Sequence, residues 1–273
     1  METRPFAAAT AAPVGALLRE WRASRRWSQL DLALEAGLST RHLSCIETGK
    51  SQPSRDTVLR LADTLDMPLR ERNTLLTAAG YAPIYPETSL DTPQLTEIRR
   101  AINFILAQQE PYPAFLVNRH WDILQANDAA ARVGAFVMQG RESQHTNMLH
   151  HIFNPNELRP AFANWEEVAG DLIRHLHAVI AATPSDVRAR SLLDEILAYP
   201  DVPQSWRTRD LSRNPGPLMN TVFDVAGQTL RFFSTITTFG TPRDVTIEEL
   251  HIECCFPVDE ATAAFCRKLA AEG

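Results

Sequence analysis

The chain of 273 residues is long enough for two domains, since a domain usually has about 100–200 residues. Its apolar share of 44% and charged share of 22% are typical of a globular protein and exclude disordered and fibrous chains. No apolar run approaches the roughly 20 residues of a membrane-spanning helix, and the first residues lack the apolar core of a signal peptide. We therefore expect a cytoplasmic protein without a membrane partner.

The net charge of −6 is divided unevenly along the chain. Residues 1–82 carry 11 basic and 9 acidic side chains, a net of +2, whereas the remainder carries 16 basic and 24 acidic side chains, a net of −8. Arginine supplies all of the positive charges except Lys50 and Lys268. This asymmetry is a weak indication that the first part of the chain meets phosphate.

Residues 15–80 have the apolar spacing of a series of short helices, preceded by a flexible N-terminus over 1–14. Gly37 ends a predicted helix of about residues 29–36, because glycine adopts a left-handed backbone at little cost. Ser39 is placed to cap the next helix. Two helices across a short glycine-containing turn form a helix-turn-helix.

The second of these helices, which runs to about Glu47, has one apolar and one polar side. Leu43 and Ile46 share the apolar side. The opposite side carries small polar residues and one arginine, whose guanidinium could donate a bidentate pair to guanine. These outward-facing residues are Thr40, Arg41, Ser44, Cys45 and Thr48.

Residues 15–79 resemble the phage-repressor-type (XRE-family) helix-turn-helix domain. The motifs in register are Ser28-Gln29, Leu32-Ala33, Ala36-Gly37-Leu38-Ser39, Leu43-Ser44, Ile46-Glu47 and Gly49-Lys50. The resemblance implies a lambda-repressor-like all-α bundle of about five helices that binds a palindromic DNA operator as a homodimer. It assigns Arg22 and Glu47 to a structural pair. The residues expected to contact DNA are Gln29, which would hold phosphate at a helix N-terminus, with Ser39, Thr40, Arg41, Ser44, Cys45 and Lys50.

A proline-rich linker over 81–93 precedes a second domain over 94–273, in which the pattern changes. A helix is predicted over about 94–109, and the residue spacing typical of helices returns over 126–200. Asn127 or Asp128 is in a position to cap the first helix of this region. A short strand is predicted at 114–118, with a hairpin partner at 121–125. Alternating residues predict that the last 55 residues are strand-like, with a hairpin turn at 226–228. The expected fold class is α+β, one antiparallel sheet with a helical cover.

This second region resembles the PAS-like sensor half of MmyB-like bacterial regulators over about residues 110–260. The motifs that carry the resemblance are Phe115–Ala131, Asn147–Phe153, Arg159, Asn164-Trp165-Glu166 and Leu250–Pro257. Residues 140–147 form a longer connection than that family's pattern has, and the turn at 213–217 lacks its histidine.

The resemblance implies a pocket between sheet and helices for a small apolar ligand such as a fatty acid, and no other cofactor. Asn147 or Arg159 could meet a carboxylate at its mouth, although Arg159 could instead pair with Glu157 or Glu166. Most of the apolar candidates would also suit an ordinary core. The expected ligand-binding residues are Phe115, Val117, Phe136, Asn147, Leu149, Phe153, Arg159, Trp165, Phe232, Ile236 and Cys254.

Catalytic and metal sites are not indicated. The sequence has no GxSxG, P-loop, GxGxxG or HExxH motif, and no CxxC pair among its four cysteines. His175 and His177, two residues apart, point to different sides of a helix, which argues against joint metal ligation. We expect a ligand-responsive transcription regulator, acting as a repressor, and not an enzyme. The alternatives are a DNA-anchored protein-interaction module and a heme or flavin redox sensor.

Overall fold

The computed structural model describes residues 14–208 and 219–272, which divide into two compact units. The first consists mainly of the chain up to Pro86, and the second mainly of the chain from Glu87. Residues 1–13 of the expected flexible terminus and the turn at 213–217 lie outside the described residues. No helix in the described part of the chain has the length and hydropathy needed to cross a membrane.

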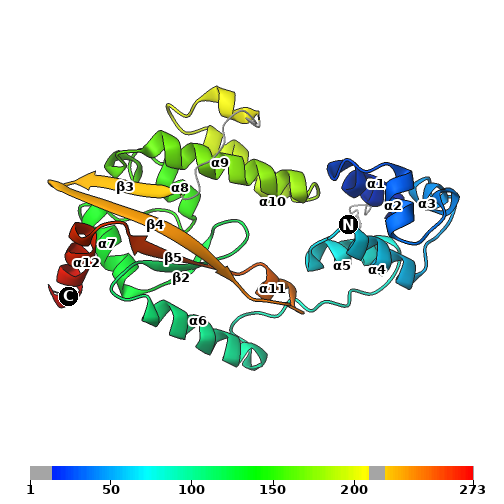
Figure 1. Cartoon of the computed structure of the whole chain (residues 1–273), viewed down its shortest axis with the longest axis horizontal. Coiled ribbons are helices and arrows are strands. Elements are labelled where there is room, and N and C mark those ends of the chain that lie inside the picture. Colours follow the sequence, from blue (N-terminus) through cyan, green and yellow to red (C-terminus); the bar gives the residue numbers. More distant parts are fainter. Residues whose placement is uncertain (1–13, 209–218, 273) are drawn as a thin grey trace, which may run out of the picture. The chain divides into compact units, whose positions relative to one another are not determined.

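Helices alone build the first unit (Figure 1). Those in its described residues are α1 (Val14–Ser24), α2 (Gln29–Glu35), α3 (Thr40–Glu47), α4 (Arg55–Thr64) and α5 (Leu69–Ala78). Their apolar sides meet in one core, whose largest fully buried members include Trp21, Leu18, Leu32, Leu43, Ile46, Leu61, Leu65, Leu75 and Leu76. The predicted all-α bundle is confirmed.

Local signals define the helix-turn-helix within this unit. Ser28 caps α2 in a reciprocal capping box with Asp31, and the Ser39 hydroxyl accepts a hydrogen bond from the backbone N–H of His42 at the start of α3. Gly37, between the two helices, has a φ of 62°, in the left-handed region that glycine favours. The predicted turn and the predicted starts of both helices are confirmed.

The backbone of α1 passes very close to the end of α3. A Cβ atom placed on Gly15 would lie 2.4 Å from the carbonyl oxygen of Ile46 and 2.7 Å from that of Glu47. Only a residue without a side chain allows this approach, and the atoms in conflict are backbone atoms that cannot rotate away. Gly15 therefore sets the distance between α1 and the C-terminal end of α3.

The second unit is built around a five-stranded antiparallel sheet with the order β2-β1-β5-β4-β3 (Figure 1). Its strands are β1 (Ala114–Val117), β2 (Ile123–Ala126), β3 (Asn220–Val225), β4 (Gln228–Thr238) and β5 (His251–Pro257). Ala226 and Gly227, both with positive φ, form the predicted turn between β3 and β4. The α+β fold class is confirmed.

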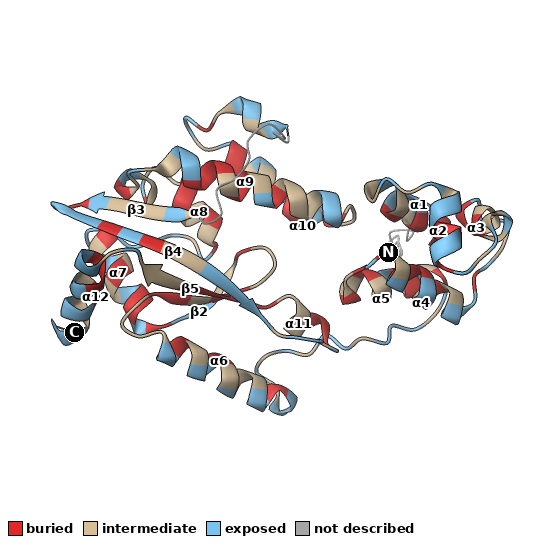
Figure 2. Cartoon of the chain, in the orientation of Figure 1, coloured by how far each residue is buried: buried red, intermediate tan, exposed pale blue. Residues whose placement is uncertain are grey.

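Helices cover both faces of this sheet. On one face, α6 (Thr96–Gln108) packs Ile102 and Leu106 against a cluster that includes Leu116, Ile252 and Cys254. The other face is covered by α7 (Asp128–Val137), α8 (Met148–Phe153), α9 (Trp165–Ala182) and α10 (Val187–Leu197). In Figure 2, α9 carries a stripe of buried residues, as expected of an amphipathic helix that covers a core.

The end of the chain differs from the expectation of strand texture. It contains the short α11 (Val245–Glu248) and, after β5, the helix α12 (Glu260–Glu272), which packs against α7, β4 and β5. The carboxylate of Asp259 accepts a hydrogen bond from the backbone N–H of Thr262 and caps α12. The prediction extended the strand pattern of residues 250–256 too far, past this capping signal.

We expect Gly15→Ala to destabilise the first unit, because its methyl group would overlap the backbone of α3. Overpacking of this kind typically lowers the free energy of unfolding by about 1–3 kcal/mol. Thermal or urea unfolding measures the loss, with Ala16→Ser, at an exposed neighbouring position of α1, as the control. Equal stability of the two variants would contradict the close approach.

Candidate functional site

A buried ion pair fixes the end of α3 to α1. The guanidinium of Arg22 donates two hydrogen bonds to the Glu47 carboxylate, from Nε to Oε1 at 2.7 Å and from Nη2 to Oε2 at 2.9 Å. The Glu47 side chain is 0% exposed and that of Arg22 is 14% exposed. Burial alone would raise the pKa of Glu47, but hydrogen bonds from Arg22 and Gln29 and the charges of Arg22 and Arg19 hold it below its usual value. The pair has the structural position that the XRE resemblance implied.

With its inner side fixed, α3 leaves a polar surface uncovered within the first unit. Arg41 and Thr48 are exposed, and Thr40, Ser44 and Cys45 are half-buried. Ser39 and Lys50, at the two ends of the helix, are exposed as well. This is the side that the helical periodicity predicted, and its short side chains would let the helix approach base edges closely.

Gln29 has a position that the sequence did not indicate. Its amide Nε2 donates a hydrogen bond of 2.8 Å to Oε2 of Glu47, so the side chain belongs to the buried network of Arg22. A side-chain contact of Gln29 with phosphate would compete with this bond. Its backbone N–H, at the first residue of α2, is the group that agrees better with the expected phosphate contact.

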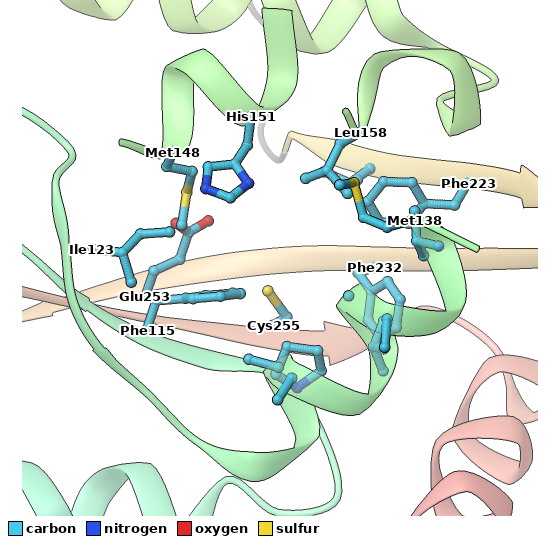
Figure 3. A pocket seen from close by; sticks show the side chains of 18 of the residues that line it. Phe115, Ile123, Met138, Met148, His151, Leu158, Phe223, Phe232, Glu253 and Cys255 are labelled. Atoms are coloured by element: carbon cyan, nitrogen blue, oxygen red, sulfur yellow. The ribbon is translucent and has the colours of Figure 1, made fainter. Parts of the chain in front are cut away.

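A cavity of about 400 Å³ lies inside the second unit, between the sheet and the helices α7 and α8 (Figure 3). This volume is within the range of small-molecule sites. Most of its lining is apolar, and the residues labelled in Figure 3 are Phe115, Ile123, Met138, Met148, His151, Leu158, Phe223, Phe232, Glu253 and Cys255.

Small residues on α7 leave the space for this cavity. Ala130, Ala131, Gly134 and Ala135 all line it, at helical spacings that place them along one side of α7. Asn127 starts the helix, since its side-chain oxygen accepts hydrogen bonds from the backbone N–H groups of Ala130 and, on β1, Ala114. The anchored helix thus presents these small residues to the cavity, together with Val133 and Val137.

The main polar group of the cavity floor is Glu253 on β5. It lies directly opposite Phe115 in the register of β1 and β5 and is 8% exposed. Figure 3 shows its carboxyl group directed toward the side of the cavity where Met148 and His151 lie. Burial raises the pKa of Glu253 above its usual value, and a hydrogen bond with Ser234 opposes this only in part.

The long connection at residues 140–147 supplies part of the rim. Arg141 and Ser143 line the cavity, and Arg141 donates hydrogen bonds to the backbone carbonyls of Met138, Asn156 and Glu157. The departure from the family pattern at these residues therefore contributes to the cavity itself. No pattern in residues 140–147 indicated this role.

A second acidic side chain, Glu157, lies behind the rim and has several partners. Its carboxylate accepts a hydrogen bond from Ser143 and pairs with His145, both at 2.5 Å, and Nδ1 of His151 lies 3.3 Å from Oε2. Burial would raise the pKa of Glu157, but these bonds and the histidines hold it lower. Burial lowers the pKa of His151, which favours its neutral form.

Of the eleven predicted ligand-binding residues, Phe115 and Phe232 line the cavity. Phe136 points elsewhere, with its ring 4.7 Å from that of Phe265 on α12. Ile236 is 51% exposed near the end of β4, beyond the cavity. Four others belong to or pack against the core cluster that includes α9 and α10, and do not line the cavity: Val117, Leu149, Phe153 and Trp165.

Cys254 was predicted in the pocket, but its neighbour Cys255 lines the cavity instead. Successive residues of a strand point to opposite faces, so the side chain of Cys254 packs toward α6. The sequence pattern placed Leu250, Ile252, Cys254 and Phe256 on the buried face and left the other face open. In the structure both faces are covered, and Glu253 and Cys255 point into the cavity.

The two expected carboxylate-binding residues have other partners. Asn147 is buried at the N-cap of α8, where its Nδ2 donates to the carbonyl of His120 and to Asp122. The Arg159 guanidinium stacks over Trp165 at 3.8 Å and donates to the carbonyl of Pro200. Neither residue lines the cavity, so this structure does not bring them to a ligand there.

No cluster of three or more metal-ligating side chains occurs in residues 14–208 and 219–272. His175 packs edge-on against Trp121, whereas Nε2 of His177 meets the carbonyl of Trp206, so the two rings do point apart. The outward-facing helix and the mainly apolar cavity define a helix-turn-helix domain joined to a domain with room for a small molecule.

Comparison with known families agrees with this division. The profile described as "MmyB-like transcription regulator ligand binding domain" matches residues 98–269, and that of a helix-turn-helix domain matches residues 13–75. Because the first match covers more than half of the chain, the protein belongs to the family of MmyB-like transcription regulators.

The individual relatives match short parts of the chain. The HTH-type transcriptional regulator Rv0023 of Mycobacterium tuberculosis is 42% identical over 65 residues, which are 24% of this chain and 25% of the relative. RghRB of Bacillus subtilis is 37% identical over 76 residues, 28% of this chain and 52% of the relative. The match thus spans about a quarter of the mycobacterial protein. The solved "Structure of an RNA-binding Light-Oxygen-Voltage Receptor" aligns at 15% identity over 97% of this chain and 64% of that chain, with a TM-score of 0.25, which carries no argument about fold.

Proposed function

We propose that this protein is a DNA-binding transcription regulator that responds to a small apolar molecule held in the cavity of its second unit. In this proposal α3 enters the major groove, two copies bind a palindromic operator as a homodimer, and the protein acts in the cytoplasm as a repressor. The second unit is then a PAS-like sensor without catalytic activity.

The observation that supports DNA binding is the polar surface of α3. The Arg22–Glu47 pair fixes the inner side of this helix, and Arg41, Ser44 and Thr48 face away from the core. A helix-turn-helix reads DNA in this way, with side chains near the start of its second helix contacting base edges. Exposed lysine and arginine side chains around it, including Lys50, would supply phosphate contacts.

The observation that supports ligand sensing is the cavity. A cavity of about 400 Å³ with a mainly apolar lining has the size and chemical character of a small-molecule site. A bound apolar molecule would bury that lining and gain contacts with its apolar atoms. The resemblance suggested a fatty acid, and the apolar chain is the part of that suggestion which the lining favours.

We expect Arg41→Ala to weaken sequence-selective DNA binding by about 10- to 100-fold, since a bidentate contact with a base is worth about 1–3 kcal/mol. Fluorescence anisotropy with the DNA upstream of the protein's own gene measures the change. The control is Arg188→Ala, which removes a surface arginine that pairs with Glu195 in the second unit. Equal losses in both variants, or wild-type binding without sequence preference, would refute a role of Arg41 in base contact.

We expect Gly134→Leu to abolish the response to ligand while preserving DNA binding. A Cβ atom at Gly134 meets no heavy atom within 4 Å, so the leucine can occupy the cavity, and leucine also favours a helix more than glycine does. The measurement is the change in DNA affinity on adding decylamine, decanol or decanoate, three apolar probes of equal chain length with different head groups.

Ala264→Leu serves as the matched control, because it adds a similar side chain at an exposed position of α12 outside the cavity lining. The control should respond like the wild type. A Gly134→Leu protein that still responds in full would show that the cavity is not the sensing site.

A further inference from the structure

The carboxyl group of Glu253 is the one feature of the cavity that neither packing nor the proposed function has explained. Its Oε2 atom is buried and has no hydrogen-bond partner among the described residues. Buried polar atoms in folded proteins almost always have a partner, so an orphaned carboxyl oxygen beside an apolar cavity calls for one.

Among the described residues, the side chains of the strands and of α8 that line the cavity carry no fixed positive charge. Phe115 lies opposite it on β1, and Ser234 on β4 provides a hydroxyl. Met148 and His151 of α8 line the same cavity, where burial favours the neutral form of His151. His251, two residues earlier on the same face of β5, also has its pKa lowered by burial.

Arg141 is the one arginine or lysine in the part of the cavity lining that the structure describes, and it already has partners. Its Nε, Nη1 and Nη2 atoms all donate to backbone carbonyls, at 2.8, 3.3 and 3.4 Å. Glu157 behind the rim, in contrast to Glu253, has hydrogen bonds on both of its carboxylate oxygens. Among the described residues that line the cavity, Glu253 alone has a carboxyl oxygen that is buried and without a partner.

We propose that Glu253 binds the polar end of the ligand, and that the ligand is therefore an apolar molecule whose head group donates hydrogen bonds, a primary amine or an alcohol, and not a carboxylate. The apolar chain occupies the space between α7 and the sheet. The head group reaches Oε2 of Glu253, and the positive charge of an ammonium group would stabilise the ionised carboxylate against the effect of burial.

Elementary electrostatics gives the order of affinities. Inside a cavity of low dielectric constant a cation and a carboxylate attract strongly, and a charge-assisted hydrogen bond is about twice as strong as a neutral one. An alcohol donates a hydrogen bond without this charge. A carboxylate would lie beside a second carboxyl group and could bind only if one of the two took up a proton.

This inference depends on the proposed ligand site, and calorimetric titration of the full-length protein with three probes of equal chain length tests it. The probes are decylamine, decanol and decanoate. We expect the wild type to bind decylamine at least about tenfold more tightly than decanoate, with decanol between them.

The variant Glu253→Gln keeps the shape of the side chain and a carbonyl oxygen that accepts hydrogen bonds. It should lose at least about tenfold in affinity for decylamine, whereas its affinity for decanol should change by less than about threefold. Its melting temperature should not fall, because an unpaired buried carboxyl group does not stabilise the fold. The matched control, Glu97→Gln on the exposed surface of α6, should bind all three probes like the wild type.

The inference is overturned if decanoate binds as tightly as decylamine, if Glu253→Gln leaves their ratio unchanged, or if none of the probes binds. Binding that survives in Gly134→Leu would place the probes elsewhere and overturn it as well. The proposed function fails differently. In that case the probes bind with the expected preference, but occupancy of the cavity leaves the affinity for operator DNA unchanged.

Discussion

The requirement that a buried carboxyl group find a hydrogen-bond donor, a positive charge or a proton governs both units of this protein. Glu47 meets it within the chain, through two bonds from Arg22 and one from Gln29. Glu253 meets it only in part, since one of its oxygens has no partner among the described residues. Removing either carboxylate from water is costly, so the difference between them separates a structural group from one whose partner comes from outside.

The satisfied glutamate has a consequence for the surface that faces away from it. Glu47 is the last residue of α3, so the bidentate bond to Arg22 fixes the rotation of that helix about its axis. Gly15 adds the second constraint, the close passage of α1 over the carbonyls at the same end. A helix held in this way presents Arg41 and Ser44 in one direction without any contribution from their own side chains. The polar surface of α3 is thus not needed to hold the helix in its place.

Single residues with strong local preferences made the fold predictable, whereas the cavity depends on the small size of several side chains on α7. Gly37, Ser39 and the Ala226-Gly227 turn act locally, so the sequence predicted the helix-turn-helix and the last hairpin correctly. A cavity exists where α7 has alanine and glycine, and no periodicity distinguishes such a side from close packing. The alternation on β5 was recognised, but it could not show that helices cover both faces. For this reason Cys254 was expected in the pocket, and Glu253 was overlooked.

The unpartnered Glu253 also limits which ligands gain the full binding free energy in the cavity. A molecule that enters the cavity gains the contacts of an apolar chain and, if its head group donates, the bond that Glu253 lacks. Both gains stabilise the second unit, and they influence DNA binding only to the extent that the ligand favours one state of the protein over another. An apolar ligand without a donating head group would gain only the contacts of its hydrocarbon chain. The pairing with Glu253 therefore distinguishes ligands with a donating head group from other apolar molecules, because a ligand that leaves this buried carboxyl oxygen unpaired gains less on binding.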